Sequence, residues 1–229
     1  MWIAALLVAL FCHSTSFAGE EGAPGAREPA QVMSYLGADW LERGTRFDEE
    51  RPDMLLKAMG LEPGDVVADI GVGSGYHARP MAKAVGPEGK VYGVDIQPEM
   101  LEILKTRCEE SDITNVVPVL SETADPKLPK GKIDWMLLVD VYHEFQEPEP
   151  MLAKLREALA PDGRVALAEY RLHGETAANI KVDHRMSPEQ VMKEWTPAGF
   201  ELVELIETLP KQHLFIFKKK KDDKDEQAK

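Results

Sequence analysis

The sequence predicts a doubly wound α/β fold, in which a mostly parallel sheet includes one antiparallel strand near its end. Short apolar runs alternate with segments of helical periodicity along most of the 229 residues. This alternation is typical of a parallel sheet covered by helices. Near the end, only the stretch Thr208 to Gln212 separates the apolar segments 201–207 and 213–218. A connection that short cannot hold a crossover helix, so we expect an antiparallel hairpin there.

The first predicted elements surround a glycine-rich turn. The residues from Asp48 to Gly60 have the spacing of an amphipathic helix that ends at a glycine. The next segment, VVADI, is a short apolar run that fits a buried parallel strand. Pro80 is tolerated in a helix only within the first turn, so we expect the following helix to begin near Tyr76.

The remaining elements continue the alternation to the hairpin. Ser187 is suited to cap a helix that has Pro188 at its first position and continues through Trp195. Strands are expected at 90–96, 116–120, 132–140 and 164–170, and helices at 98–110 and 149–160. We assign residues 48–218 to this one domain, because its length suits a single core.

The segments outside the domain differ from it in composition. Residues 1–18 combine a short apolar run with small residues at positions 16 and 18, the pattern of a signal peptide. The run is too short to span a membrane, so we expect a periplasmic or secreted protein without a stable membrane anchor. The alternative is a cytoplasmic protein whose start lies nearer Met33. Residues 19–47 are expected to form an irregular cap, and 219–229 a disordered charged tail.

The overall charge limits the partners of the protein. The formal net charge is −13 and the isoelectric point is near 5.0. Nucleic-acid phosphates need a basic face, so we expect no nucleic-acid partner. After cleavage of the leader only Cys108 would remain, and no internal disulfide could then form.

The stretch VADIGVGSGYHA has the composition of a nucleotide cradle between a strand and a helix. Gly71, Gly73 and Gly75 allow close approach of a ligand to the backbone, and the helix start offers free N–H groups. Asp95 ends the next strand, where a carboxylate can accept both hydroxyls of a ribose. The spacing is G-x-G-x-G rather than the G-x-G-x-x-G of pyrophosphate sites. Asp69 would repel a diphosphate but suits an ammonium group.

VADIGVGSG and VYGVDI resemble the class I S-adenosylmethionine-dependent methyltransferases, and the resemblance extends over about residues 55–218. It implies a Rossmann-like seven-stranded sheet with a reversed final strand and S-adenosylmethionine as cofactor. DVYHEF, EYR and LPKQH are similar to a subgroup of small, often exported bacterial members. The resemblance assigns cofactor binding to the following residues: Asp69, Gly71, Gly73, Gly75, Asp95, Ile96, Glu122, Thr123 and Asp140.

The acceptor side is expected where the fourth and fifth strands end, because ligands of doubly wound sheets lie beyond the carboxyl ends of the strands. Methyl transfer to a hydroxyl needs alignment and removal of one proton, a task that suits histidine. We predict His143 as the general base, with His213 and Tyr142 as further catalytic candidates. The expected substrate-binding residues are Glu144, Glu169, Tyr170 and Arg171.

Three alternatives stay open. His143, Glu144, Glu169, His184 and His213 have ligand types that suit a divalent metal ion, but their positions show no ligand spacing, so no metal is predicted. An exported protein could keep the fold as a ligand-binding module without turnover. A nicotinamide-dependent oxidoreductase is disfavoured by the glycine spacing and by Asp69. The leading prediction is methyl transfer from S-adenosylmethionine to a small-molecule acceptor.

Overall fold

The computed structural model describes residues 27–174 and 178–221. The predicted signal peptide and most of the predicted tail lie outside these residues. The strands are β1 (Val66–Ile70), β2 (Lys90–Asp95), β3 (Val116–Leu120), β4 (Ile133–Val139), β5 (Leu159–Tyr170), β6 (Phe200–Ile206) and β7 (Gln212–Lys219). The strand β7 includes Lys219, which was assigned to the tail.

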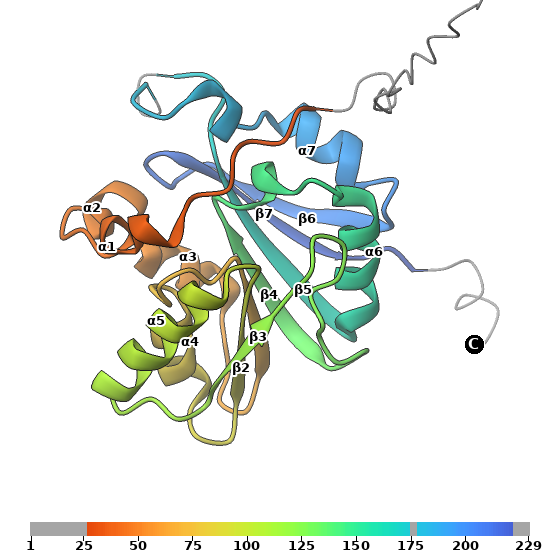
Figure 1. Ribbon diagram of the computed structural model, residues 1–229. Helices are drawn as coiled ribbons and strands as arrows, with labels where there is room; N and C mark the ends of the chain where they lie inside the picture. The colour runs from red at the N-terminus through yellow and green to blue at the C-terminus, as the bar shows by residue number, and fades with distance from the viewer. Residues whose placement is uncertain (1–26, 175–177, 222–229) are drawn as a thin grey trace, which may run out of the picture.

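The strands form one seven-stranded sheet in the order β3-β2-β1-β4-β5-β7-β6 (Figure 1). The pairs β1–β2, β1–β4, β2–β3 and β4–β5 are parallel. β7 is antiparallel to both β5 and β6, which makes it the reversed strand. The predicted fold class is therefore confirmed, including the hairpin at the end of the domain.

Helices cover both faces of the sheet (Figure 1). The longer helices are α3 (Pro52–Met59), α4 (Ala78–Val85), α5 (Pro98–Glu110), α6 (Pro148–Ala158) and α7 (Pro188–Trp195). α3, α4 and α5 pack on one face and α6 and α7 on the other. Alternate residues of the strands divide between the two cores, as in β4, where Leu137 belongs to the core under α3, α4 and α5 and Leu138 to the core under α6 and α7. No helix of the described ranges is both long and apolar enough to span a bilayer.

Two helix boundaries differ from the sequence prediction. The predicted helix from Asp48 to Gly60 is divided into α2 (Arg46–Glu50) and α3 at Arg51, which has φ 51°. Pro52 disfavours a helical conformation of the preceding residue, and this explains the break. The helix α4 begins at Ala78, two residues after the predicted start, with Pro80 in its first turn. The predicted cap of α7 is confirmed, since the Ser187 side chain accepts from Gln190 N.

The predicted irregular segment before the domain falls within the described residues from residue 27 onward. It contains η1 (Tyr35–Gly37) and α1 (Ala38–Leu41). We call residues 27–37, which end with η1, the N-terminal strap. The strap crosses the end of the sheet from the side of α7 to α1 (Figure 1). Its backbone bonds to a segment far along the chain, with Ala30 N donating to His143 O at 2.9 Å.

Candidate functional site

A pocket of about 580 Å³ lies at the carboxyl ends of β1, β2, β4 and β5. β1 and β4 are neighbours in the sheet although their helices cover opposite faces, which makes this the switch point where doubly wound sheets bind ligands. The pocket is lined by these predicted site residues: Asp69, Gly71, Gly73, Asp95, Ile96, Glu122, Thr123, Asp140, His143, Glu144 and Tyr170.

The glycine-rich turn forms the floor of the pocket. Gly71 has φ 72°, and a Cβ atom built there would lie 2.3 Å from Val141 Cγ2. Gly73 has φ 51°, and its Cβ atom would lie 2.8 Å from Leu41 Cδ1. Both positions therefore disfavour a side chain by conformation, and Gly71 also by space.

The carboxylate of Asp95 is fixed by backbone donors. Its Oδ2 atom accepts from Gly73 N at 2.9 Å and its Oδ1 atom from Gln97 N at 2.9 Å. Asp95 thus connects the end of β2 to the glycine-rich turn. Each oxygen keeps a lone pair, so the fixed carboxylate can still accept two hydroxyl groups.

Asp69 is buried at the end of β1, and its Oδ2 atom has no hydrogen-bond partner within the described chain. Burial raises the pKa of Asp69 to about 7, although Arg46 acts in the opposite direction. An unpartnered buried acceptor is costly. A cationic ligand group placed beside it would satisfy the oxygen and favour its ionised form.

The far side of the pocket is more open. Ile96 is 40% exposed and lines the pocket, where its apolar side chain is available to a ligand. Glu122 is exposed and pairs with Lys127 at 3.1 Å, while Thr123 Oγ1 donates to Glu147 at 2.6 Å. Both residues follow β3 and border the pocket beside Ile96.

His143 belongs to η2 (Tyr142–Glu144), the short turn after β4, and is 2% exposed. Its Nδ1 atom lies 2.6 Å from the Oε2 atom of Glu169, which is fully buried in β5. Burial alone would lower the pKa of His143, but the Glu169 carboxylate outweighs it and raises the pKa to about 9. Nε2 of His143 has no partner within the described chain.

Two further carboxyl groups face the pocket. Glu144 Oε1 accepts from Met33 N at 3.1 Å, and burial raises the pKa of Glu144 to about 7. Asp140 has φ 50°; its Oδ2 atom accepts from Gln212 Nε2 at 2.9 Å, while Oδ1 has no partner in the described part. Burial and the nearby Glu50 hold the pKa of Asp140 well above its usual range.

Helix α2 supplies a wall of the pocket that the sequence prediction missed. Arg46 of α2 lines the pocket, together with Trp40 of the preceding helix α1. Arg46 Nε lies 2.8 Å from Glu50 Oε2, and its guanidinium covers the Tyr76 ring at 4.3 Å. Tyr170 Oη donates to Glu50 Oε1 at 3.2 Å, which connects α2 to β5. The break at Pro52 is the local signal for this separate helix.

Two histidines in the pocket were not among the predicted site residues, although His184 was considered as a possible metal ligand. His77 follows the glycine-rich turn directly and is 6% exposed; Nδ1 has no partner among the described residues. Burial, with Arg46 nearby, holds the pKa of His77 well below its usual value. The position of His77 in VADIGVGSGYHA could have identified it. His184, at the end of η4 (Val182–His184), lies 41 positions beyond His143, and no local pattern connects them.

Five of the predicted residues do not line the pocket. A Cβ atom at Gly75 would lie 2.4 Å from Leu104 Cδ1, so this glycine permits helix packing. Tyr142 Oη donates to Glu194 at 2.5 Å, and Glu169 lies behind His143. Arg171 and His213 both bind Glu207, at 3.1 and 2.7 Å, outside the pocket. His213 points away because its neighbour Gln212 occupies the strand face toward Asp140.

Comparison with known proteins agrees with this geometry. Residues 61–224 match the family described as Methyltransferase domain. A fibrillarin-like rRNA/tRNA 2'-O-methyltransferase of Thermococcus onnurineus is 34% identical over 170 residues, or 72% of this chain and 71% of the relative. Nocamycin O-methyltransferase of Saccharothrix syringae is 31% identical over 136 residues, or 59% of this chain and 49% of the relative.

The solved structure of an S-adenosylmethionine-dependent methyltransferase from Aquifex aeolicus has the same fold, with a TM-score of 0.75. It is 24% identical, and the match covers 81% of this chain and 98% of that chain. The matches with the first three curated relatives span 33%, 49% and 47% of their lengths. The family match covers most of the domain that carries the pocket. The chain therefore belongs to the methyltransferase domain family, whose cofactor is S-adenosylmethionine.

Proposed function

We propose that the protein transfers a methyl group from S-adenosylmethionine to a small-molecule acceptor. The observation that carries this proposal is the single pocket that joins the glycine-rich turn and Asp95 to the polar groups of His143, Glu144 and Tyr170. Its volume of about 580 Å³ falls within the range of small-ligand sites, roughly 300 to 1,000 Å³. Donor and acceptor would share one cavity.

The donor fits the polar groups that the chain leaves unsatisfied. Asp69 Oδ2 would accept from the ammonium of the methionine part, and Asp95 from the ribose hydroxyls. Ile96 would pack on the adenine, with Glu122 and Thr123 at the edge of the ring. The turn with Gly71 and Gly73 would pass close to the sulfonium.

The acceptor is proposed to lie between η2, Asp140 and Tyr170. In the transfer, the acceptor atom forms a bond to the methyl carbon as the carbon–sulfur bond breaks. S-adenosylhomocysteine leaves, and the acceptor loses one proton. His143 is the proposed recipient of that proton, held by Glu169. His143 can accept the proton only in its neutral form. The acceptor must therefore bind while Nε2 of His143 carries no proton and Nδ1 is held by Glu169.

The acidic composition supports a small acceptor over a nucleic acid, because a net charge of −13 gives phosphates no general attraction. Known relatives act on different classes of acceptor, since their names include an rRNA/tRNA enzyme and protein-L-isoaspartate O-methyltransferases. Fractionation distinguishes the classes. Host extract is divided into low-mass, RNA and protein fractions, and each is incubated with the full chain and methyl-labelled donor.

The label is expected in the low-mass fraction, and label confined to RNA or protein would contradict the small-molecule proposal. Donor binding is measured separately by isothermal titration calorimetry. If donor and S-adenosylhomocysteine fail to bind at about 1 mM, a concentration that detects free energies down to roughly −4 kcal/mol, methyl transfer is refuted. Tight donor binding with no labelled product in any fraction would favour a binding module without turnover.

We also propose that the protein is exported, in line with the small exported subgroup, because residues 1–18 have the signal-peptide pattern. The test is the N-terminal residue of the protein purified from its native host, together with the cell fraction that contains it. A mature start near residue 19 in the periplasmic or secreted fraction would support export. A cytoplasmic protein that retains the leader residues or starts near Met33 would refute it.

A further inference from the structure

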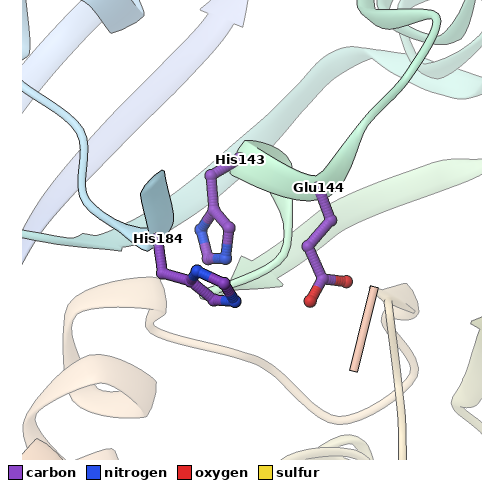
Figure 2. Close-up of side chains that lie close together, drawn as sticks. All are labelled: His143, Glu144 and His184. Carbon is purple, nitrogen blue, oxygen red and sulfur yellow. The ribbon is translucent and has the colours of Figure 1, made fainter. Parts of the chain in front are cut away.

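The acceptor side of the pocket brings together three side chains whose ligand types suit a metal ion. His143 and Glu144 project from η2, and His184 projects toward them from η4 (Figure 2). One nitrogen or oxygen atom of each lies within 4.8 Å of the other two. All three residues line the pocket. The sequence spacing predicted no metal because the third residue comes from a distant segment.

We propose that His143, Glu144 and His184 bind a divalent first-row metal ion of the zinc class at the acceptor end of the pocket. Two imidazoles and one carboxylate are the protein ligands of one type of catalytic zinc site, in which the fourth position stays open for water or substrate. Imidazole also suits cobalt and other divalent ions of this row, whereas calcium and magnesium prefer sites made of oxygen alone.

The unpartnered nitrogen of His143 is the independent observation that points to a ligand. The residue is 2% exposed, and Nε2 has no hydrogen-bond partner among the described residues. Nδ1 is taken by Glu169 at 2.6 Å. A buried ring nitrogen without a partner is unfavourable, and a metal ion would satisfy it.

Both histidines are oriented by a carboxylate on the opposite ring atom. Glu169 binds Nδ1 of His143, and Asp183 binds Nδ1 of His184 at 2.8 Å. Metal-binding histidines usually carry such a carboxylate or carbonyl on the second nitrogen, because it fixes the ring and the tautomer. The arrangement leaves the Nε2 atom of each ring for the ion, and the two ring centroids lie 5.0 Å apart.

The ligand atoms need to approach one another by a small amount. With bonds of about 2.1 Å in a tetrahedral site, ligand atoms are separated by about 3.4 Å. Glu144 and His184 are both partly exposed, and Glu144 reaches the site through a flexible side chain. They can therefore move by the ångström or so that is required, whereas His143 is held by Glu169.

The proposal deepens the proposed function and rests on it for its chemical role. The open position of the ion would hold an oxygen of the acceptor beside the donor methyl group. With the ion bound, Nε2 of His143 is a ligand and no longer accepts the acceptor proton, so the ion replaces His143 in that role. Coordination lowers the pKa of a bound hydroxyl group, which then loses its proton to water before it attacks the methyl carbon. The acceptor class is therefore a small molecule with a hydroxyl group that can bind a metal ion.

The test is isothermal titration of the metal-free full chain with Zn²⁺ alone, and its visible absorption with Co²⁺. We expect one ion per chain that binds in competition with the second metal. His184→Ala should lower the Zn²⁺ affinity by more than a hundredfold, and Glu144→Gln should also lower it strongly. Asp183→Asn should cost about tenfold, the lower end of the range for carboxylates that orient ligand histidines.

His173→Ala is the matched control, because His173 is an exposed histidine on the same connection after β5 and does not line the pocket. Its Zn²⁺ affinity should equal that of the unmodified chain. Absence of Zn²⁺ binding would overturn the metal site. So would a Zn²⁺ affinity of the His184→Ala and Glu144→Gln variants equal to that of the unmodified chain. His184 is partly exposed, so its variant should fold, and thermal denaturation verifies this.

The same samples are titrated with S-adenosylhomocysteine, which separates the two proposals. Donor-site binding without metal binding would refute the metal site and leave the proposed function intact. Metal binding that depends on His184, with no donor-site binding, would refute the proposed function and leave the metal site standing. A transfer assay with and without chelator then follows only if both ligands bind.

Discussion

Asp95 is the residue on which the nucleotide site depends most directly. Its two oxygens hold Gly73 N and Gln97 N, so the same carboxylate that would accept the ribose also shapes the turn beneath it. Loss of a charge-assisted hydrogen bond costs about 1.5 to 3 kcal/mol. Asp95→Ala should therefore weaken S-adenosylmethionine binding at least about tenfold, as measured by calorimetry.

Asp95→Asn is the informative companion, because it keeps one acceptor oxygen and removes the charge. We expect an affinity between those of the original chain and the Asp95→Ala variant. Thermal denaturation of the free proteins shows whether the turn itself is disturbed. Equal donor affinity in all three proteins would place the nucleotide elsewhere.

Asp69 makes donor binding depend on pH. Because its pKa is raised to about 7, the carboxyl group is largely protonated in more acidic solution and attracts the donor ammonium only after ionisation. The donor affinity should therefore rise by up to about tenfold per pH unit as the pH increases toward 7, and then level off. Calorimetry between about pH 5.5 and 7.5 covers this window, below the usual titration of an α-amino group near 8.

The same group has the opposite effect on the free protein. A carboxyl group whose folded pKa lies above its unfolded value contributes stability that is fully present below the unfolded pKa, near 4, and is lost as the pH rises through 7. Asp69→Asn should flatten both the affinity profile and this part of the stability profile. A steep affinity profile in Asp69→Asn would assign the titration to another group.

The helix α2 belongs to the site as an element rather than through a single contact. Arg46 is 5% exposed; it pairs with Glu50, donates to Leu41 O at 2.9 Å and covers Tyr76. Arg46→Met keeps much of the packing but removes the charge from a buried pair. Removal of one partner of such a pair costs roughly 3 to 5 kcal/mol.

We expect the lower end of that range for Arg46→Met, because Arg43 also contacts Glu50 at 2.8 Å. At 2 to 4 °C per kcal/mol, the melting temperature should fall by roughly 6 to 12 °C in thermal denaturation. Arg51→Met is the control, since its pair with Asp53 is exposed on both sides and its loss should lower the melting temperature much less. Equal losses in the two variants would show that the α2 pair does not hold the wall.

Strands were easier to predict from the sequence than the pocket wall. Runs such as VVADI are buried on both faces, so their composition alone identifies a central strand. The residues that end β1, β2 and β4 followed from the strand boundaries. The α2 wall and His184 did not, because their positions depend on contacts between segments more than 30 residues apart. His213 was expected at the rim of the pocket. Side chains alternate along β7, so Gln212 faces Asp140 and His213 points away to Glu207.

The whole molecule should respond to its ligand as one cooperative unit. A ligand at a hundred times its dissociation constant stabilises the folded state by about 2.7 kcal/mol. For a chain of this size, S-adenosylhomocysteine should therefore raise the melting temperature by roughly 5 to 11 °C. The measurement is thermal denaturation at several ligand concentrations.

Reduced nicotinamide cofactor at the same concentration is the control for the dinucleotide alternative, and it should leave the melting temperature unchanged. The Asp95→Asn variant should give a smaller rise than the unmodified chain at equal S-adenosylhomocysteine. A larger rise with the nicotinamide cofactor than with S-adenosylhomocysteine would contradict the assignment of the cradle.

The N-terminal strap also determines when the site can come into existence during synthesis. Arg27 donates to the carbonyl oxygens of Tyr142 and His143, which lie 115 and 116 positions later. At 5 to 20 residues per second, a ribosome needs roughly 6 to 23 seconds to make that intervening chain. The strap is made before Tyr142 and His143, so its hydrogen bonds to their carbonyl oxygens form only later. The complete pocket, whose lining extends from Gln31 to His184, can therefore form only after the later strands have been made.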